Sequence, residues 1–345
     1  MPHPHNALLL PYVDTGGRQA RIDALAPASP AGQRQLLIYT VTLNPALDRT
    51  LYVESLAPGQ STRIRREARY AGGKGIDVSR ALREMGSDNV ALGLVGGFDG
   101  KELEGRLLLA GVACRFTRIA NETRTNIIIQ DEPSGSETAL LARGPEVQPS
   151  ELMDFLDVLE KLPDMSFLIL SGSLPPGLTP EVYCRIITIG NERGARVVLD
   201  TAGDALRQGI QARPAIIKPN RFELAELAGK EFTDVRAIAE YCTGLSDRVE
   251  IVLVSIGPEG IVMVTRDEVL HARPPKVKVK STVGAGDCAV AGFVHGLAAG
   301  EPAADALRQA VAAGSAATLN AGTGLCRRAD IEAILPRVTV EEIKL

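Results

Sequence analysis

The sequence predicts an α/β protein with a mainly parallel β-sheet, helices on both faces of that sheet, and a small β-sheet lid. Short apolar runs alternate with helical segments of ten or more residues from residue 36 onward. This alternation is typical of a parallel sheet, because parallel strands are joined by crossover helices. Two stretches, 49–70 and 114–142, instead contain short half-polar strands. A sheet of this kind needs a face to cover, so we expect these strands to form the lid.

Each element follows from a local pattern. Apolar runs between turn residues predict buried strands at 36–43, 89–95, 167–170, 196–200, 251–255 and 260–265. Helix-forming segments that follow glycine or proline turns predict helices at 75–85, 101–110, 180–193, 221–228, 235–245, after residue 287, and as a pair within 303–319. Residues 1–35 are proline-rich and lack periodicity, so we expect a poorly ordered extension before one domain at 36–345.

The composition excludes several classes of protein. The net charge of −4 argues against a nucleic-acid-binding protein. No apolar run approaches the roughly 18 residues that a membrane helix needs. Five scattered cysteines form no pair or cluster typical of a disulfide scaffold or a zinc site, so we expect a reducing, cytoplasmic location.

The most informative segment is Ser281–Val294, in which a glycine turn precedes an apolar helix. The first amides of a helix are unpaired and attract phosphate oxygens. Gly284 and Gly286 leave those amides accessible, and Asp287 would lie beside the bound anion. A carboxylate in that place can take a proton from an attacking hydroxyl. The alternative is a glycine turn whose aspartate only caps the helix.

Two further segments place polar groups near the first strand. Asp48 follows that strand, where a carboxylate could accept hydrogen bonds from sugar hydroxyls, or could be an ordinary turn residue. The glycine-rich loop 72–75 fits neither a P-loop nor a dinucleotide fingerprint. It predicts close backbone approach to a polar ligand, with Asp77 and Lys74 reaching it, or a generic tight turn.

Later segments add a candidate clamp and a candidate metal site. Arg124 and Asn126 would share one face of a lid strand, where they could bind phosphate and a hydroxyl or simply face solvent. Ser173 lies in a rigid Gly-Pro loop that either approaches a ligand or has no role. Asn220 and Glu223 could hold hydrated Mg²⁺, or could form a helix capping box.

Together these motifs resemble the PfkB (ribokinase-like) family of carbohydrate kinases over residues 36–335, and within it the phosphosugar branch. Three segments carry the branch resemblance: 42–48, 171–177 and 218–223. The stretches 274–287 and 312–320 are most similar to bacterial type II 6-phosphofructokinases. The resemblance implies a Rossmann-like core with a β-lid, the substrates ATP and a phosphorylated ketohexose, Mg²⁺ with K⁺ as a further ion, and a homodimer joined through the lids.

The resemblance also assigns roles to residues. It implies Asp287 as the base, with Gly284, Ala285 and Gly286 as the anion hole. Sugar-phosphate positions are Asp48, Gly72, Gly73, Lys74, Gly75, Asp77, Arg124, Asn126 and Ser173. Positions on the MgATP side are Lys218, Asn220, Glu223, Ser255, Gly257, Gly260 and Ser315. Positions near a monovalent cation are Ser281, Val283, Asn320 and Gly322. Asp77 stands where the family commonly has Asn, which adds a negative charge and removes a donor.

The expected reaction is phosphorylation of fructose 6-phosphate by ATP to fructose 1,6-bisphosphate. Phosphorylation of fructose 1-phosphate or tagatose 6-phosphate is an alternative that uses almost the same residues. A non-catalytic sensor of sugar phosphates is an alternative of another class, but such a protein has no use for a base beside the γ-phosphate.

Overall fold

Ten described strands form the large sheet of the computed structural model, which describes residues 37–56, 59–320 and 324–345. Their spatial order is β14 (Thr339–Glu342), β13 (Val269–Arg273), β12 (Ile261–Val264), β11 (Ile251–Ser255), β10 (Ile216–Ile217), β9 (Arg196–Asp200), β8 (Phe167–Ser171), β1 (Ile38–Thr42), β4 (Asn89–Gly96) and β5 (Ala113–Ile119). The strands from β11 to β5 pair in parallel. The three strands β12, β13 and β14 add an antiparallel edge. The predicted mainly parallel sheet is confirmed.

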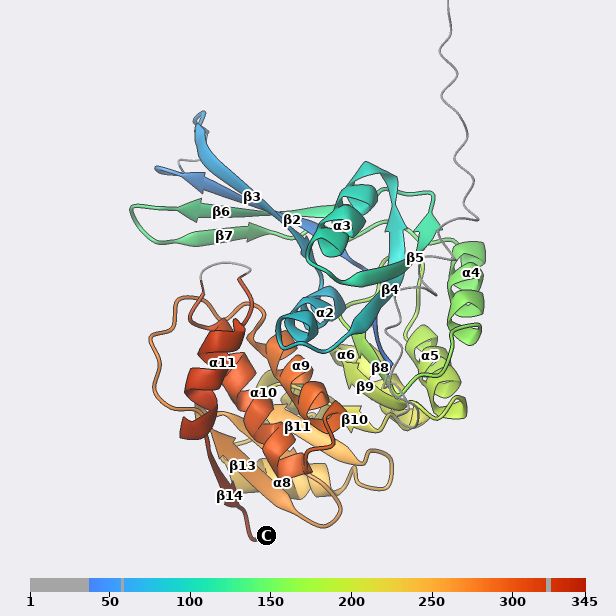
Figure 1. Cartoon of the computed structure of the whole chain (residues 1–345), viewed down its shortest axis with the longest axis vertical. Coiled ribbons are helices and arrows are strands. Elements are labelled where there is room, and N and C mark those ends of the chain that lie inside the picture. The colour runs from blue at the N-terminus through green and yellow to red at the C-terminus, as the bar shows by residue number, and fades with distance from the viewer. Residues whose placement is uncertain (1–36, 57–58, 321–323) are drawn as a thin grey trace, which may run out of the picture. The chain divides into compact units, whose positions relative to one another are not determined.

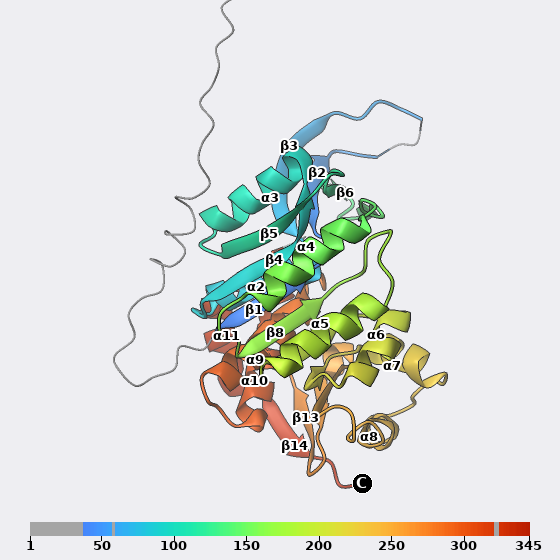
Figure 2. The same ribbon diagram turned by 90° about the vertical axis from the view of Figure 1, so that its right-hand side faces the viewer.

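Helices cover both faces of this sheet, as the sequence predicts (Figures 1 and 2). Alternate side chains of the strands pack into apolar cores on opposite faces. One face carries α4 (Pro149–Glu160), α5 (Glu181–Glu192), α6 (Gly203–Gly209), α7 (Arg221–Ala228) and α8 (Val235–Thr243). The other carries α2 (Lys74–Glu84), α3 (Gly97–Leu109), α9 (Ala285–Ala298), α10 (Ala303–Ala317) and α11 (Arg328–Ile334). Short 3₁₀ turns are η1 (Ile210–Ala212), η2 (Gly257–Glu259) and η3 (Leu335–Arg337).

The expected small sheet is present, with the order β3 (Ile64–Gly72), β2 (Ala46–Val53), β6 (Arg124–Asp131) and β7 (Glu137–Leu140). In Figure 1 these strands extend away from the helices that cover the large sheet. One part of the prediction is wrong, because β5 pairs with β4 in the large sheet instead of joining the lid. As the edge strand of that sheet, β5 is partly exposed, which explains its half-polar sequence.

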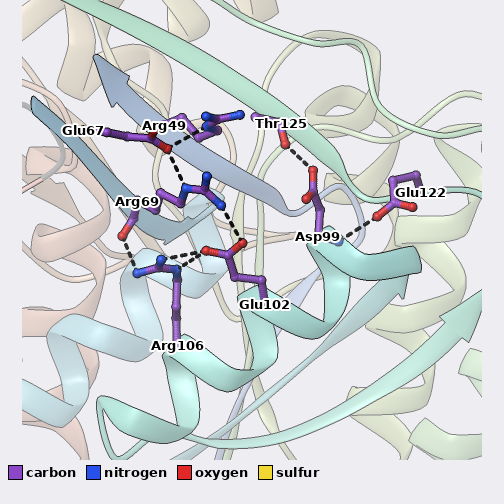
Figure 3. Close-up of polar contacts among 8 residues, drawn as sticks. All are labelled: Arg49, Glu67, Arg69, Asp99, Glu102, Arg106, Glu122 and Thr125. Carbon is purple, nitrogen blue, oxygen red and sulfur yellow. Dashed lines mark hydrogen bonds and ion pairs between the residues drawn. The ribbon is translucent and has the colours of Figure 1, made fainter. Parts of the chain in front are cut away.

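An ionic network joins the lid to α3 (Figure 3). Glu67 accepts hydrogen bonds from Arg49 at 2.9 Å and from Arg69 at 2.5 Å. Arg69 also bonds to Glu102 of α3 at 3.0 Å. Arg106 bonds to Glu102 at 2.6 Å and donates to the carbonyl of Arg69 at 2.9 Å. The base of the lid is therefore attached to a helix of the main domain through both side chains and backbone.

The sequence analysis differs from the structure in a few elements. Residues 303–317 form one helix and not the expected pair. The helices α4, α6 and α11 and the strands β13 and β14 were not predicted. The expected extension at 1–35 lies outside the described residues. None of the described helices is long and apolar enough to cross a membrane.

Candidate active site

Asp287 lies in the first turn of α9 and is only 8% exposed. Gly284 precedes the helix in a left-handed conformation, with φ at 74°. A Cβ atom at Gly284 would lie 2.7 Å from Cδ2 of Leu325, so space as well as backbone geometry requires glycine here. The conformation of this turn therefore fixes where α9 begins and so the position of Asp287 in its first turn.

The amides of this turn are available to an anion. Ala285 donates only a long bond of 3.4 Å to the carbonyl of Thr282. Among the described residues, the amides of Gly286 and Asp287 bond to no backbone carbonyl, as expected at a helix start. A Cβ atom at Gly286 would lie 3.4 Å from Nζ of Lys218. A positive side chain thus lies beside amides that already attract negative charge.

A buried carboxylate holds the lysines of the site. Asp200, at the carboxyl end of β9, is 1% exposed, and Nζ of Lys218 lies 3.2 Å from its Oδ1. Nζ of Lys74 lies 3.7 Å from the same oxygen and 3.9 Å from Glu223. Neither carboxylate oxygen of Asp200 has a hydrogen bond from a described residue. The sequence analysis missed Asp200, although its position directly after a buried strand was a usable signal.

This charge cluster sets the proton affinity of Asp287. Burial is the main cause that raises the pKa of Asp287 to about 7, and the negative charge of Asp200 raises it further. Lys74 and Lys218 act in the opposite direction. The charge of Asp200 is also the main cause that raises the pKa of Lys74. A carboxylate with a pKa near neutrality can accept a proton at physiological pH.

Asp48 faces the same region from the lid. It lies within β2, and not in the turn after the first strand where the sequence analysis placed it. Its Oδ1 accepts a hydrogen bond of 2.8 Å from Asn126, whose own Oδ1 accepts from the amide of Ala142. A Cβ atom at Gly72 would lie 2.1 Å from Oδ2 of Asp48. Burial raises the pKa of Asp48, while the bond from Asn126 lowers it.

Arg124 is held by backbone carbonyls. Its two terminal nitrogens donate to Ala142 at 2.7 Å and to Asn44 at 2.9 Å. Its buried Nε bonds to no described residue. Asn44 in turn donates to Oγ of Ser173 at 3.3 Å, which joins the lid to the loop after β8. The sequence analysis included Asn44 in a motif but assigned it no role.

Asp77 is paired with an arginine that the sequence analysis did not consider. Nη1 of Arg80 bonds to Oδ1 of Asp77 at 2.9 Å and to the carbonyl of Ala71 at 3.2 Å. Burial is the main cause that raises the pKa of Asp77 well above its usual range. Arg80 lowers this pKa, whereas Asp287 and Asp48 raise it. The carboxylate of Asp77 therefore lies in a cluster of acidic side chains with Asp48 and Asp287, and Arg80 partly neutralises its charge.

The remaining loops border the site at neighbouring strand ends. The loop at 72–75 starts α2 with Gly73 at a φ of 116°. A Cβ atom at Gly75 would lie 2.5 Å from Oγ1 of Thr42, so this glycine permits close packing of α2 on β1. Gly257 and Gly260, in the turn after β11, also have positive φ angles, of 65° and 101°.

Asn220 and Glu223 form the helix capping box, which was one of the two interpretations of this segment. Oδ1 of Asn220 accepts from the amides of Phe222 and Glu223, each at 2.9 Å. Oε2 of Glu223 accepts from the amide of Asn220 at 2.8 Å, and Asn220 pairs with Ser255 across neighbouring strand ends. The oxygens here and on Asp200 are hard donors of the type Mg²⁺ prefers, so the donor set fits a hydrated Mg²⁺ bound to phosphate.

Ser315, and two of the positions expected near a monovalent cation, form hydrogen bonds with residues close to them in the chain. Oγ of Ser281 accepts from the amide of Val283 at 3.2 Å. Asn320 donates to the carbonyls of Ala316 and Leu325. The hydroxyl of Ser315 donates to Val311 at 2.7 Å within α10. Gly322 lies outside the described residues.

Known proteins are similar to this chain over most of its length. The family model described as "pfkB family carbohydrate kinase" matches residues 41–330. A 1-phosphofructokinase of Bacillus subtilis is 34% identical over 308 residues, which are 89% of this chain and 100% of that protein. A 1-phosphofructokinase of Vibrio cholerae is 33% identical, over 89% of this chain and 97% of that protein.

Solved structures of phosphofructokinases are also similar to this chain over most of its length. The phosphofructokinase-2 of Escherichia coli in complex with potassium has a TM-score of 0.84 and 32% identity, and the match covers 88% of this chain and 99% of that one. The same enzyme in complex with fructose-6-phosphate has a TM-score of 0.82 and 30% identity, with the same coverage.

Proposed function

The chain belongs to the pfkB family of carbohydrate kinases and is an ATP-dependent sugar kinase of the phosphofructokinase type; we propose that it converts fructose 6-phosphate to fructose 1,6-bisphosphate. The observation that carries the kinase chemistry is the placement of Asp287. It is a buried carboxylate with a pKa raised to about 7, in the first turn of a helix whose amides are open to an anion.

In the proposed mechanism, Asp287 takes the proton from the O1 hydroxyl of the sugar as that oxygen attacks the γ-phosphorus of ATP. The amides of the Gly284–Asp287 turn and the ammonium group of Lys218 bind the oxygens of the transferring phosphoryl group. Because these groups are fixed before the reaction, they stabilise the developing charge without reorganisation. Asn220, Glu223 and Asp200 would hold Mg²⁺ through water, and the ion would neutralise charge on the nucleotide phosphates.

The sugar would bind between the lid and the loop at 72–75. Asp48, oriented by Asn126, would accept hydrogen bonds from hydroxyls, and the carbonyls that hold Arg124 would keep its guanidinium at the phosphate end. The Asn44–Ser173 bond joins this lid edge to the main domain. Correct alignment of the two substrates would supply a large part of the rate enhancement.

Fructose 6-phosphate is favoured by the segments 274–287 and 312–320, which are most similar to type II 6-phosphofructokinases. Fructose 1-phosphate is a second candidate, because curated relatives with 32–34% identity are named 1-phosphofructokinase. Both sugars would give fructose 1,6-bisphosphate, so the difference lies in which end of the sugar faces Asp287.

Steady-state release of ADP with fructose 6-phosphate, fructose 1-phosphate and tagatose 6-phosphate tests this proposal. We expect the highest kcat/KM for fructose 6-phosphate, and a larger value for either other sugar would overturn the choice. Asp287→Asn is the control for chemistry and should lower kcat by at least about 10²-fold. Tight sugar binding without ADP release from any of the three would favour the sensor function instead.

Three further parts of the proposal concern the state of the enzyme. A homodimer through the lids is supported by the exposed apolar side chains of Ile64, Leu140 and Leu141, and light scattering would test it. A K⁺ requirement, tested by exchange of K⁺ for Na⁺, is supported by the similarity to an enzyme crystallised with potassium. Cytoplasmic location agrees with five cysteines that are all free thiols.

A further inference from the structure

A cavity of about 330 Å³ lies at the edge of the large sheet opposite the active site. The strands β9, β10 and β11 are parallel neighbours, and the cavity is lined by the residues at and before their starts. Asp200, Lys218 and Ser255 lie at the other ends of these strands, so the cavity is separate from the site described above.

The cavity lining has an excess of positive charge. Arg196, Arg213 and Arg248 line it, together with Asp247 and Glu250. Glu250 is paired with Arg196 at 2.9 Å. Asp247 lies 3.8 Å from Arg266, a residue outside the lining. The two acidic side chains therefore have partners already, and the remaining charge belongs to Arg213 and Arg248.

Those two arginines precede neighbouring strands and line the same cavity. Ile216 of β10 is the register partner of Ile251 of β11, and Arg213 and Arg248 each lie three residues before these partners. Both side chains are exposed, and neither forms a hydrogen bond or an ion pair with any residue that the structure describes. A bound anion in the cavity could therefore pair with both charges.

The backbone of Arg213 gives an independent observation. Its φ of 57° and ψ of 61° are left-handed, and it is the one described non-glycine residue with a positive φ. Asn191 fixes this conformation by donating to the carbonyls of Ala212 and Arg213 at 3.0 and 3.1 Å. Glycine would adopt these angles without strain, so an arginine here is costly unless its side chain has a use.

We propose that the Arg213–Arg248 cavity binds a small phosphate monoester. Guanidinium groups bind phosphate in a two-point geometry, and two unpaired ones at one cavity match a dianion. The volume is at the lower end of the range for small-molecule sites, which indicates a metabolite-sized ester and not a nucleic acid. The side chain of Arg213 would thus explain its strained backbone.

Isothermal titration calorimetry of the full chain at low ionic strength tests the proposal, with glycerol 3-phosphate and inorganic phosphate as probes. Wild-type protein, Arg213→Gly, Arg248→Gln and a matched control, Arg236→Gln on α8, are compared. All four proteins have the same active site, so the heat of binding there is the same in each titration and does not affect the comparison. We expect one additional site in the wild type and the control, weakened roughly 10- to 100-fold in the other two.

Arg213→Gly also separates loss of binding from loss of folding. Glycine relieves the left-handed strain, so the melting temperature should rise by roughly 1–4 °C while the site is lost. Equal numbers of sites in wild type, Arg213→Gly and Arg248→Gln would overturn the proposal. Weaker binding of glycerol 3-phosphate than of inorganic phosphate at this site would overturn the assignment to an ester.

Discussion

Replacement of Asp287 by Asn should make the protein inactive and, at alkaline pH, more stable. The pKa of Asp287 is raised from 3.8 to about 7, mainly by burial. The folded protein therefore holds this proton more strongly than the unfolded chain does. The stabilisation that results is fully present below about pH 4 and is lost as the pH rises through 7.

The size of the effect follows from the two pKa values. A shift of one unit corresponds to about 1.4 kcal/mol, so the shift at Asp287 represents up to about 4 kcal/mol. Between pH 5 and pH 8, the free energy of unfolding of the wild type should fall by roughly 2 to 3 kcal/mol because of this group alone. The asparagine side chain of the variant does not titrate, so this component should be absent from its profile.

Urea unfolding of wild type and Asp287→Asn at several pH values between 5 and 8 measures this difference. Other groups titrate in both proteins, so the difference between the two profiles reports the titration of Asp287 together with its effect on Asp77. The variant should gain stability relative to the wild type as the pH rises, while kcat falls at least about 10²-fold. Parallel stability profiles would show that the pKa is not raised, and the argument for Asp287 as a neutral-pH base would fail.

Three further predictions concern the surroundings of Asp287. Lys218→Met should move the acidic limb of the kcat/KM profile upward by roughly one unit, because Lys218 lowers the pKa of Asp287; an unmoved limb contradicts this. Gly72→Ala should raise the KM for the sugar and so lower kcat/KM roughly 10-fold or more, because the Cβ atom of the new alanine displaces Asp48. The KM for ATP should stay unchanged and is the internal control. Glu102→Gln should reduce the free energy of unfolding by less than about 1 kcal/mol, because its ion pairs are partly exposed; a larger loss would mean that the lid and α3 unfold together.

Most of the fold could be predicted because it depends on local periodicity. Alternating apolar strands and helices identify the parallel sheet directly. Edge strands and some helices gave the errors. The strand β5 is half-exposed and looked like a lid strand, β14 is too short and polar to be noticed, and the helices α4, α6 and α11 were missed. Which sheet such a strand joins depends on its contacts with residues far away in the sequence, and a short sequence window gives no information about these contacts.

The site could be predicted only where a motif surrounds the residue. The glycine turn before Asp287 led to the proposed anion hole and base, and the spacing of Asn220 and Glu223 predicted the capping box as one of two interpretations. Asp200 and Arg80 have no such motif. The position of Asp200 at the end of a buried strand was the one available signal, and its contact with Lys218 appears only in the folded chain, as does the pairing of Arg80 with Asp77.

The balance of charge explains why the proposed base has lysines beside it. Burial and Asp200 already raise the pKa of Asp287 to about 7, and the phosphates of both substrates would bring more negative charge. Without opposing charges, Asp287 would be protonated when the substrates are bound and could not accept a proton. Lys74 and Lys218 lower this pKa, and Asp200 keeps their ammonium groups in place and raises the pKa of Lys74. Asp200 therefore has two opposite effects on Asp287: its own charge raises the pKa, and the lysines it holds lower it. Removal of Asp200 would test which effect dominates only if the lysines stayed in place, so the single lysine variants are the cleaner experiment.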